Sequence, residues 1–276
     1  NRIRVWAIGN TRSLDTNHPD LGLTDTTVRV RSYGVPPPAD QKNGSTPLGD
    51  CLNDNSLATP FGPGCWQLFF ATRPEQPVLT PQLLDTNDSR MQQVMWAGGK
   101  LYGALDTVVR VGGVERAGIA YYAIRPWASH GSVAAVLQHE GKIAVRGNHV
   151  SYPAIAALRS GKGAIAFTLV GPDHFPSAAY VVFGANGEHG PVRVAAAGKG
   201  PDDGFSGYVP FSGTTVGRWG DYGAAAVDGD DIWIASEYIG QTCSFAEYAD
   251  FSAFGSCGGT RVTLGNWYTR ISRIDP

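Results

Sequence analysis

Three stretches of the chain share one pattern, and their spacing constrains the fold more than any other feature. They begin at Arg90, Val150 and Arg218, and each contains an apolar strand of small residues, a glycine-containing turn and a second apolar strand. Hairpins repeated every ~60–70 residues are typical of β-propeller blades joined by long loops. The sequence therefore predicts an all-β protein, a β-propeller built from four-stranded antiparallel blades.

The same strand pattern extends along the chain and places residues 1–276 in a single domain. A propeller blade contains four strands, and not every segment of the chain supplies all four. The expected segments are a partial blade at 1–33, a disulfide-containing insertion or distorted blade at 34–88, blades at 89–148 and 149–200, and a last blade at 201–276.

The expected ring is incomplete. The N-terminal segment supplies strands only over 5–10 and 27–33, and the last blade supplies three strands, of which the third covers 267–274. Because propellers contain about 4–8 blades, we expect the chain to be the C-terminal part of a six- or seven-bladed ring. Its expected partner is an upstream fragment of the same precursor or another protein subunit.

The four cysteines form two pairs with equal spacing, Cys51 with Cys65 and Cys243 with Cys257. Neither pair has the C-x-x-C spacing or the neighbouring histidine of a zinc site. We predict one disulfide within each pair, with free buried thiols as the alternative. Two such bonds indicate an oxidising location, which means a secreted, extracellular or periplasmic protein.

Charge and hydropathy exclude several classes of function. The net charge of −2 comes from 22 basic and 24 acidic residues, and the basic residues form no tract. We therefore expect no nucleic acid partner. Since no apolar run approaches the ~20 residues of a membrane-spanning helix, we also expect no membrane insertion.

Four segments resemble a family of secreted bacterial proteins, the sialidase-like β-propellers with Asp-box-like repeats, most of which are uncharacterised. The segments are Leu84–Met91, Arg218–Asp228, Ile234–Tyr238 and Asn266–Ile271. The resemblance implies the propeller fold more than any activity. The nearest counterpart of the sialidase Asp-box turn is Ala226–Trp233, which keeps the Asp-to-Trp spacing but lacks the serine.

Four charged residues stand where first strands begin in two different repeats, Asp88 and Arg90 in one and Arg218 and Asp221 in the other. In a propeller these positions line one mouth of the central channel, so we expect the four catalytic candidates to converge there. A guanidinium group binds carboxylates through a planar fork, and a carboxylate serves as general acid or base. The alternative is that each Asp–Arg pair is an ion pair that braces neighbouring blades.

Other motifs give weaker indications. Glu237 and Tyr238 resemble the tyrosine nucleophile of sialidases with its carboxylate, but neighbours in a strand point to opposite faces, so we interpret the pair as structural. The chain has no G-x-S-x-G elbow, phosphate loop or H-E-x-x-H motif, and its six histidines lack metal-ligand spacing. We expect no cofactor and no metal.

Two functions remain open. The first is a secreted or cell-surface propeller that acts as a binding or assembly module, which the missing catalytic motifs, the abundant aromatic residues and the disulfide-bonded loops favour. Carbohydrate is one ligand considered for it. The second is a glycosidase-like or lyase-like enzyme that acts on acidic carbohydrate at the channel mouth. The sequence favours the first.

Overall fold

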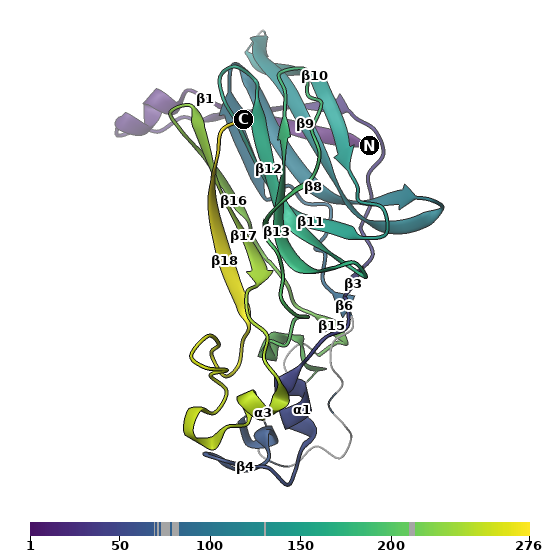
Figure 1. Ribbon diagram of the computed structural model, residues 1–276. Helices are drawn as coiled ribbons and strands as arrows, with labels where there is room; N and C mark the ends of the chain where they lie inside the picture. The colour runs from purple at the N-terminus through teal and green to yellow at the C-terminus, as the bar shows by residue number, and fades with distance from the viewer. Residues whose placement is uncertain (69, 71, 73–77, 79–82, 130, 210–212) are drawn as a thin grey trace.

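The computed structural model describes residues 1–276 except 69, 71, 73–77, 79–82, 130 and 210–212. Strand accounts for 49% of the residues and helix for 10%, so the all-β prediction is confirmed. Figure 1 shows a tall body of stacked sheets above a smaller lobe of loops and short helices. Among the described residues, no helix is long and apolar enough to cross a membrane.

The body contains three antiparallel sheets, and within each sheet the strands follow one another in sequence order. The first sheet has β7 (Gln93–Ala97), β8 (Lys100–Val111), β9 (Val114–Ser129) and β10 (Ser132–Ile143); the second has β11 (His149–Ala157), β12 (Gly163–Gly171), β13 (His174–Phe183) and β14 (Arg193–Ala196); the third has β16 (Ala224–Asp228), β17 (Asp231–Ile239) and β18 (Trp267–Ile274). The third sheet therefore has three strands, as the sequence predicts.

Glycine pairs at the hairpins explain why these strands turn so tightly. Gly98 and Gly99 join β7 to β8, and Gly112 and Gly113 join β8 to β9, all four with positive φ between 54° and 85°. Two-residue turns of this kind need a positive φ at both positions, which glycine adopts without steric cost.

The second sheet lies between the other two, as Figure 1 shows. The core between the first and second sheets includes Tyr102, Ile119, Ile155 and Phe167. The core between the second and third sheets includes Ala154, Ala156, Ala164, Ala166, Ile232 and Ile234. Because both of its faces are covered, the second sheet has a first strand, β11, in which all nine residues are buried.

An N-terminal hairpin packs on the opposite face of the first sheet. It consists of β1 (Arg2–Gly9) and β2 (Gly22–Arg29), with the 3₁₀ helix η1 (Thr11–Asp15) between them. Val5 and Val28 of the hairpin bury against Tyr122 and Ile124 of the first sheet. β2 lies against β10, the outermost strand of that sheet, and among the described strands β1 pairs with β2 alone.

The hairpin leaves β7, the first strand of its sheet, uncovered on that side. Val94 and Trp96 are 55% and 57% exposed, although β7 occupies the same position in its sheet as the fully buried β11. The third sheet is likewise uncovered on its outer face, where Trp233 and Ile271 are exposed. The stack of sheets thus exposes apolar side chains on both sides.

The three sheets neither close nor curl into a ring, so the finer prediction of a propeller is not shown. The described part of 34–88 forms no blade-like sheet. It contributes β3 (Ala39–Asp40) and β6 (Leu83–Leu84), which pair with each other and with β15 (Val216–Gly217), and the small β4–β5 hairpin (Ala58–Thr59, Gly62–Pro63). The 3₁₀ helix η2 covers Cys65–Leu68.

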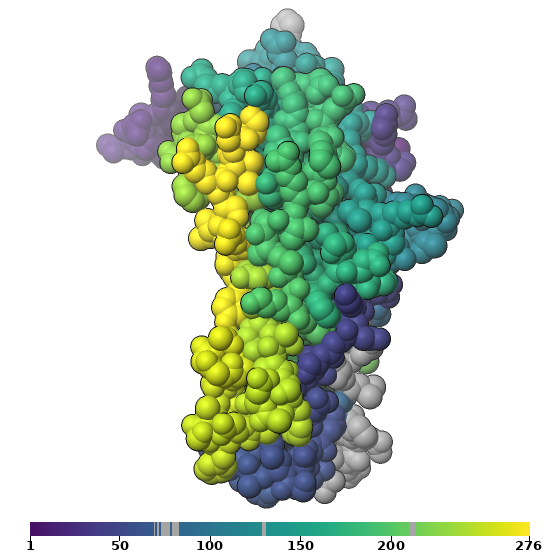
Figure 2. Space-filling view, viewed as in Figure 1, coloured from purple at the N-terminus to yellow at the C-terminus, as the bar shows by residue number. Residues whose placement is uncertain are grey.

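The lower lobe brings together two loops that are far apart in sequence, each closed by a disulfide. Cys51 is bonded to Cys65 and Cys243 to Cys257, which confirms both predicted pairs. The lobe contains α1 (Pro47–Asn53), η3 (Phe205–Gly207), α3 (Phe245–Tyr248) and η4 (Phe251–Ala253). Figure 2 shows the two loops in contact at the base of the molecule, and their shared core contains Leu48, Tyr208 and Tyr248.

Candidate functional site

A cleft with a volume of about 1260 Å³ opens beside the starts of the first strands of the three sheets. Its lining combines residues before β7, at the bulge of β11, before β16, and on β17 and β18. The first strands lie side by side there, and the Gln93 side chain of β7 donates a hydrogen bond of 2.7 Å to the carbonyl oxygen of Ala225 in β16. The cleft is therefore built by all three sheets.

The cleft brings together three of the four charged residues that the sequence singles out. Arg90, Arg218 and Asp221 line it, while Asp88 pairs with Arg90 and lies outside the lining. The segments before β7 and β16 are joined directly, since the Gln92 side chain donates a 2.8 Å hydrogen bond to the carbonyl oxygen of Asp221. The expected convergence of the two repeats is therefore present in the structure.

The ion pairs, however, do not brace neighbouring sheets. Arg90 contacts Asp88 at 2.7 Å and Arg218 contacts Asp221 at 2.7 Å, so each pair joins residues two or three positions apart, and all four side chains are exposed. The hydrogen bond from Arg90 lowers the pKa of Asp88. Both expected ion pairs are therefore present, but each lies within one segment and neither joins two sheets.

The backbone is left-handed at one residue near the start of each first strand. The φ angles are 63° at Asn87, 57° at Tyr152 and 61° at Asp221, and all three residues line the cleft. Such conformations of non-glycine residues cost about 1–3 kcal/mol and persist where surrounding contacts enforce them. The left-handed conformation of Tyr152 is held by the buried Asp106 carboxylate, which accepts a 2.9 Å hydrogen bond from the Tyr152 backbone N–H.

The floor of the cleft contains buried polar groups. Asp202 is 1% exposed and Ser236 is 6% exposed, and the Oδ2 and Oγ atoms of these residues have no hydrogen-bond partner among the described residues. Burial raises the pKa of Asp202 to about 7, although its Oδ1 accepts a 2.9 Å hydrogen bond from the Gly204 N–H. Both atoms are therefore enclosed by protein next to the cleft and are not open to it.

Glu237 adds a second carboxyl group with a raised pKa. It accepts a 3.1 Å hydrogen bond from the Gly220 N–H, and burial raises its pKa to about 7. At neutral pH the carboxyl groups of Asp202 and Glu237 are therefore partly protonated, so each is able to donate as well as accept a hydrogen bond.

Aromatic side chains form the walls. The Trp219 indole N–H donates to the Thr168 hydroxyl at 3.1 Å, which fixes that ring in the core at the cleft's edge. Trp267 packs on Phe205 with ring centroids 6.1 Å apart, and Tyr222 is largely exposed. Of these rings, Tyr222 and Trp267 have exposed surface, whereas Trp219 is buried.

The charge of the lining is acidic. Four carboxyl groups line the cleft with two guanidinium groups, and each guanidinium already has a carboxylate partner at 2.7 Å. The four carboxyl groups belong to Asp85, Asp202, Asp221 and Glu237. Both guanidinium groups are therefore already engaged by carboxylates of the chain.

Sequence reasoning missed the floor of the cleft. Glu237 and Tyr238 point to opposite faces, as the sequence predicts: Glu237 lines the cleft, while the Tyr238 ring lies 6.1 Å from that of Tyr268. The alternation of strand β17 carries the signal that identifies Glu237, since Ala235 and Glu237 share the face that lines the cleft. Asp202 lies in a loop whose burial no local pattern reveals.

No metal centre is found in the described part of the chain, where no group of three or more histidine, cysteine, aspartate or glutamate side chains is placed to hold an ion. His149 has a structural role, because its ring accepts a 3.1 Å hydrogen bond from the Ala117 backbone N–H and contacts Arg116 at 2.9 Å. His130 lies outside the described residues.

Models of known protein families give no match to this chain, and no curated protein matches its sequence. The function is therefore inferred from the cleft and from the uncovered sheet faces.

Proposed function

We propose that this chain is a segment of a secreted or cell-surface β-propeller and acts as a binding and assembly module. The observation that carries the proposal is the contrast between two equivalent strands: β11 is entirely buried between two sheets, whereas β7 exposes Val94 and Trp96. An apolar face of this kind on an extracellular module is a site of association. The two disulfides and the resemblance to sialidase-like propellers support the location and the fold.

The internal repeat indicates what covers the exposed face of β7. Between the second and third sheets, β11 packs on β16, while β12 and β13 pack on β17. The N-terminal hairpin covers only the outer strands of the first sheet, and one edge of β1 carries unpaired backbone groups. Two further antiparallel strands, added to that edge, would cover Val94 and Trp96. They would also form hydrogen bonds with the unpaired backbone groups of β1. An upstream fragment of the same precursor or another subunit supplies them.

Light scattering of the isolated 276-residue chain tests the assembly proposal. We expect species larger than 29.3 kDa that increase with concentration, because uncovered apolar faces and free strand edges associate. Trp96→Lys and Trp233→Lys should shift the population to monomer. Phe251→Lys, which changes an exposed aromatic residue of the lower lobe, is the matched control. A monodisperse wild-type monomer at all concentrations would contradict the proposal.

A second candidate function is hydrolysis of a glycosidic bond in the cleft. It is favoured by two carboxyl groups, those of Asp202 and Glu237, that share one cleft and both have a pKa of about 7. A carboxyl group that keeps its proton near neutral pH is suited to act as a general acid toward a leaving oxygen. Release of new reducing ends from oligosaccharides, lost in Glu237→Gln, would support catalysis; binding without release would reject it.

A further inference from the structure

We propose that Asp202 is a proton-sensitive latch between the sheet body and the lower lobe, closed while its carboxyl group is neutral and loosened when that group ionises. This inference goes beyond assembly, because it concerns a joint within the chain. It holds whether or not the open sheet faces are covered.

Asp202 lies where the body meets the lower lobe. Figure 1 shows β3, β6 and β15 at this junction. The Asp202 backbone N–H donates a 2.9 Å hydrogen bond to the side-chain oxygen of Gln41, which directly follows β3. The Oδ2 atom of Asp202 lies beside Gly217 of β15, where an added Cβ would be 3.2 Å from it. Asp202 is therefore part of the joint that connects the lobe to the body.

The next residue, Asp203, completes the joint on the side of the lobe. Its carboxylate accepts hydrogen bonds from the Leu48 and Gly49 N–H groups at the start of α1, at 2.9 and 3.1 Å. The Arg261 guanidinium binds Asp203 twice, through its carboxylate at 2.7 Å and its backbone carbonyl at 2.8 Å. Two successive buried carboxyl groups thus lie near one cation, and Asp203 engages that cation.

The Asp202 carboxyl group has no cation partner of its own among the described residues. Asp202 is 1% exposed, and its Oδ1 atom accepts one hydrogen bond, from the Gly204 N–H, while Oδ2 accepts none from the described residues. Burial raises the pKa of Asp202 to about 7. The neighbouring carboxyl groups of Asp203 and Glu237 also disfavour the ionised form, and Arg261 only partly offsets them. A negative charge on Asp202 is therefore poorly compensated in the closed joint.

Ionisation of Asp202 therefore favours opening of the joint. In the open joint water solvates the carboxyl group, and its pKa returns to the ordinary value of 3.8. Between 3.8 and about 7 the closed joint binds more protons than the open one, so the stability of the closed joint falls as pH rises. The equilibrium constant for opening should rise by up to about tenfold per pH unit in this range and level off above it.

Hydrogen exchange of the 276-residue chain tests the latch. The Leu48 and Gly49 amides report on the joint, because their N–H groups bind Asp203. Asp202→Asn keeps an acceptor for the Gly204 N–H but does not ionise. We expect the ratio of the exchange rates of the two reporter amides, wild type over Asp202→Asn, to rise at least tenfold from pH 5 to pH 7. A ratio that does not change with pH would overturn the inference.

Two further measurements separate the latch from a general loss of stability. In Glu237→Gln, Asp202 still ionises, so the reporter amides should retain their acceleration relative to Asp202→Asn. Amides of β12 should exchange more slowly than the reporters at pH 7, and equal rates would overturn the latch, because the whole chain would then open together. Titration of the Asp202 carboxyl carbon by NMR in the wild type should give a midpoint near 7, and a midpoint near 3.8 would overturn the inference whether or not the variants fold.

Discussion

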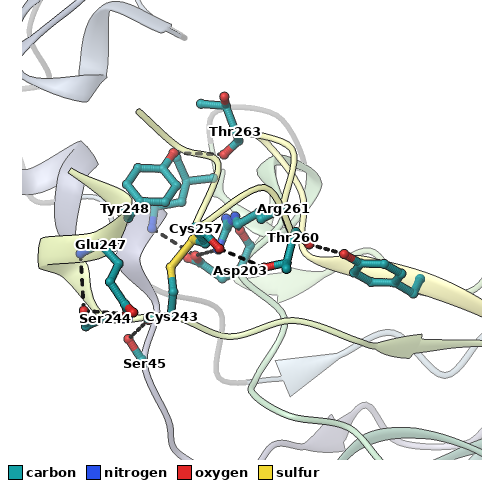
Figure 3. The surroundings of a disulfide bond; sticks show 12 residues. Ser45, Asp203, Cys243, Ser244, Glu247, Tyr248, Cys257, Thr260, Arg261 and Thr263 are labelled. Carbon is teal, nitrogen blue, oxygen red and sulfur yellow. Dashed lines mark hydrogen bonds and ion pairs between the residues drawn. A yellow bond between two sulfur atoms is a disulfide. The ribbon is translucent and has the colours of Figure 1, made fainter. Parts of the chain in front are cut away.

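Asp203 and Arg261 form an ion pair of 2.7 Å in which both side chains are completely buried. The Asp203 carboxylate also accepts hydrogen bonds from the Leu48 and Gly49 backbone N–H groups, at 2.9 and 3.1 Å, and from the Tyr208 hydroxyl. Figure 3 shows Asp203 and Arg261 beside the Cys243–Cys257 disulfide. One carboxylate thus connects the start of α1, just before the first disulfide loop, to Arg261, which follows the second loop.

Asp203→Asn should therefore destabilise the protein strongly. Breaking a buried pair leaves an uncompensated charge, which costs about 3–5 kcal/mol. Urea unfolding measures the loss, and Glu115→Gln is the control, because Glu115 pairs with Arg110 on the surface and such pairs contribute about 1 kcal/mol or less. Equal effects of the two substitutions would contradict the role assigned to Asp203.

Asp221→Asn should change the free energy of unfolding by less than about 1 kcal/mol, because the Arg218–Asp221 pair is local and exposed. Asparagine also tolerates the left-handed φ of 61° at this position. Thermal unfolding of the variant checks this, and a loss of about 1–3 kcal/mol would instead indicate that Asp221 braces the sheets.

The repeat pattern explains why so much of the sheet body was predictable. Strand β18 has the predicted bounds 267–274, and the glycine turns at 98–99 and 112–113 are local signals of the first sheet. The lower lobe was not predictable, since α1 and Tyr248 meet through contacts between loops about 190 residues apart. The cleft was predictable where it depends on repeat position, as at Arg218, and not where it depends on burial, as at Asp202.

The stability of the wild type should contain a pH-dependent contribution from Glu237. Burial raises its pKa from 4.5 to about 7, so between these values the native state binds more protons than the unfolded state. The contribution of Glu237 to stability is therefore present at low pH and falls as pH rises from 4.5 to about 7. Above that pH it is constant. The total loss of stability is on the order of 3 kcal/mol.

Urea unfolding of the wild type and Glu237→Gln at several pH values measures this contribution as the difference between the two proteins. As pH rises through this range, the wild type should lose stability relative to the Glu237→Gln variant. A difference that does not change with pH would show that Glu237 titrates normally.

Gly220→Ala should destabilise the protein more than Gly229→Ala. Both glycines have positive φ, 72° and 62°, so an alanine is strained at either by roughly 1 kcal/mol. At Gly220 the added Cβ would also meet the Tyr152 ring at 2.7 Å, whereas at Gly229 it meets open space. Chemical denaturation of both variants gives the comparison, and equal losses would show that the Tyr152 ring yields without cost.

Native mass spectrometry of the protein purified from its natural source tests the central claim, that the apolar face of β7 is covered by strands from further polypeptide. The account predicts a stable complex heavier than 29.3 kDa, in which Trp96 is protected from oxidative labelling. A species of 29.3 kDa with Trp96 fully labelled would contradict it.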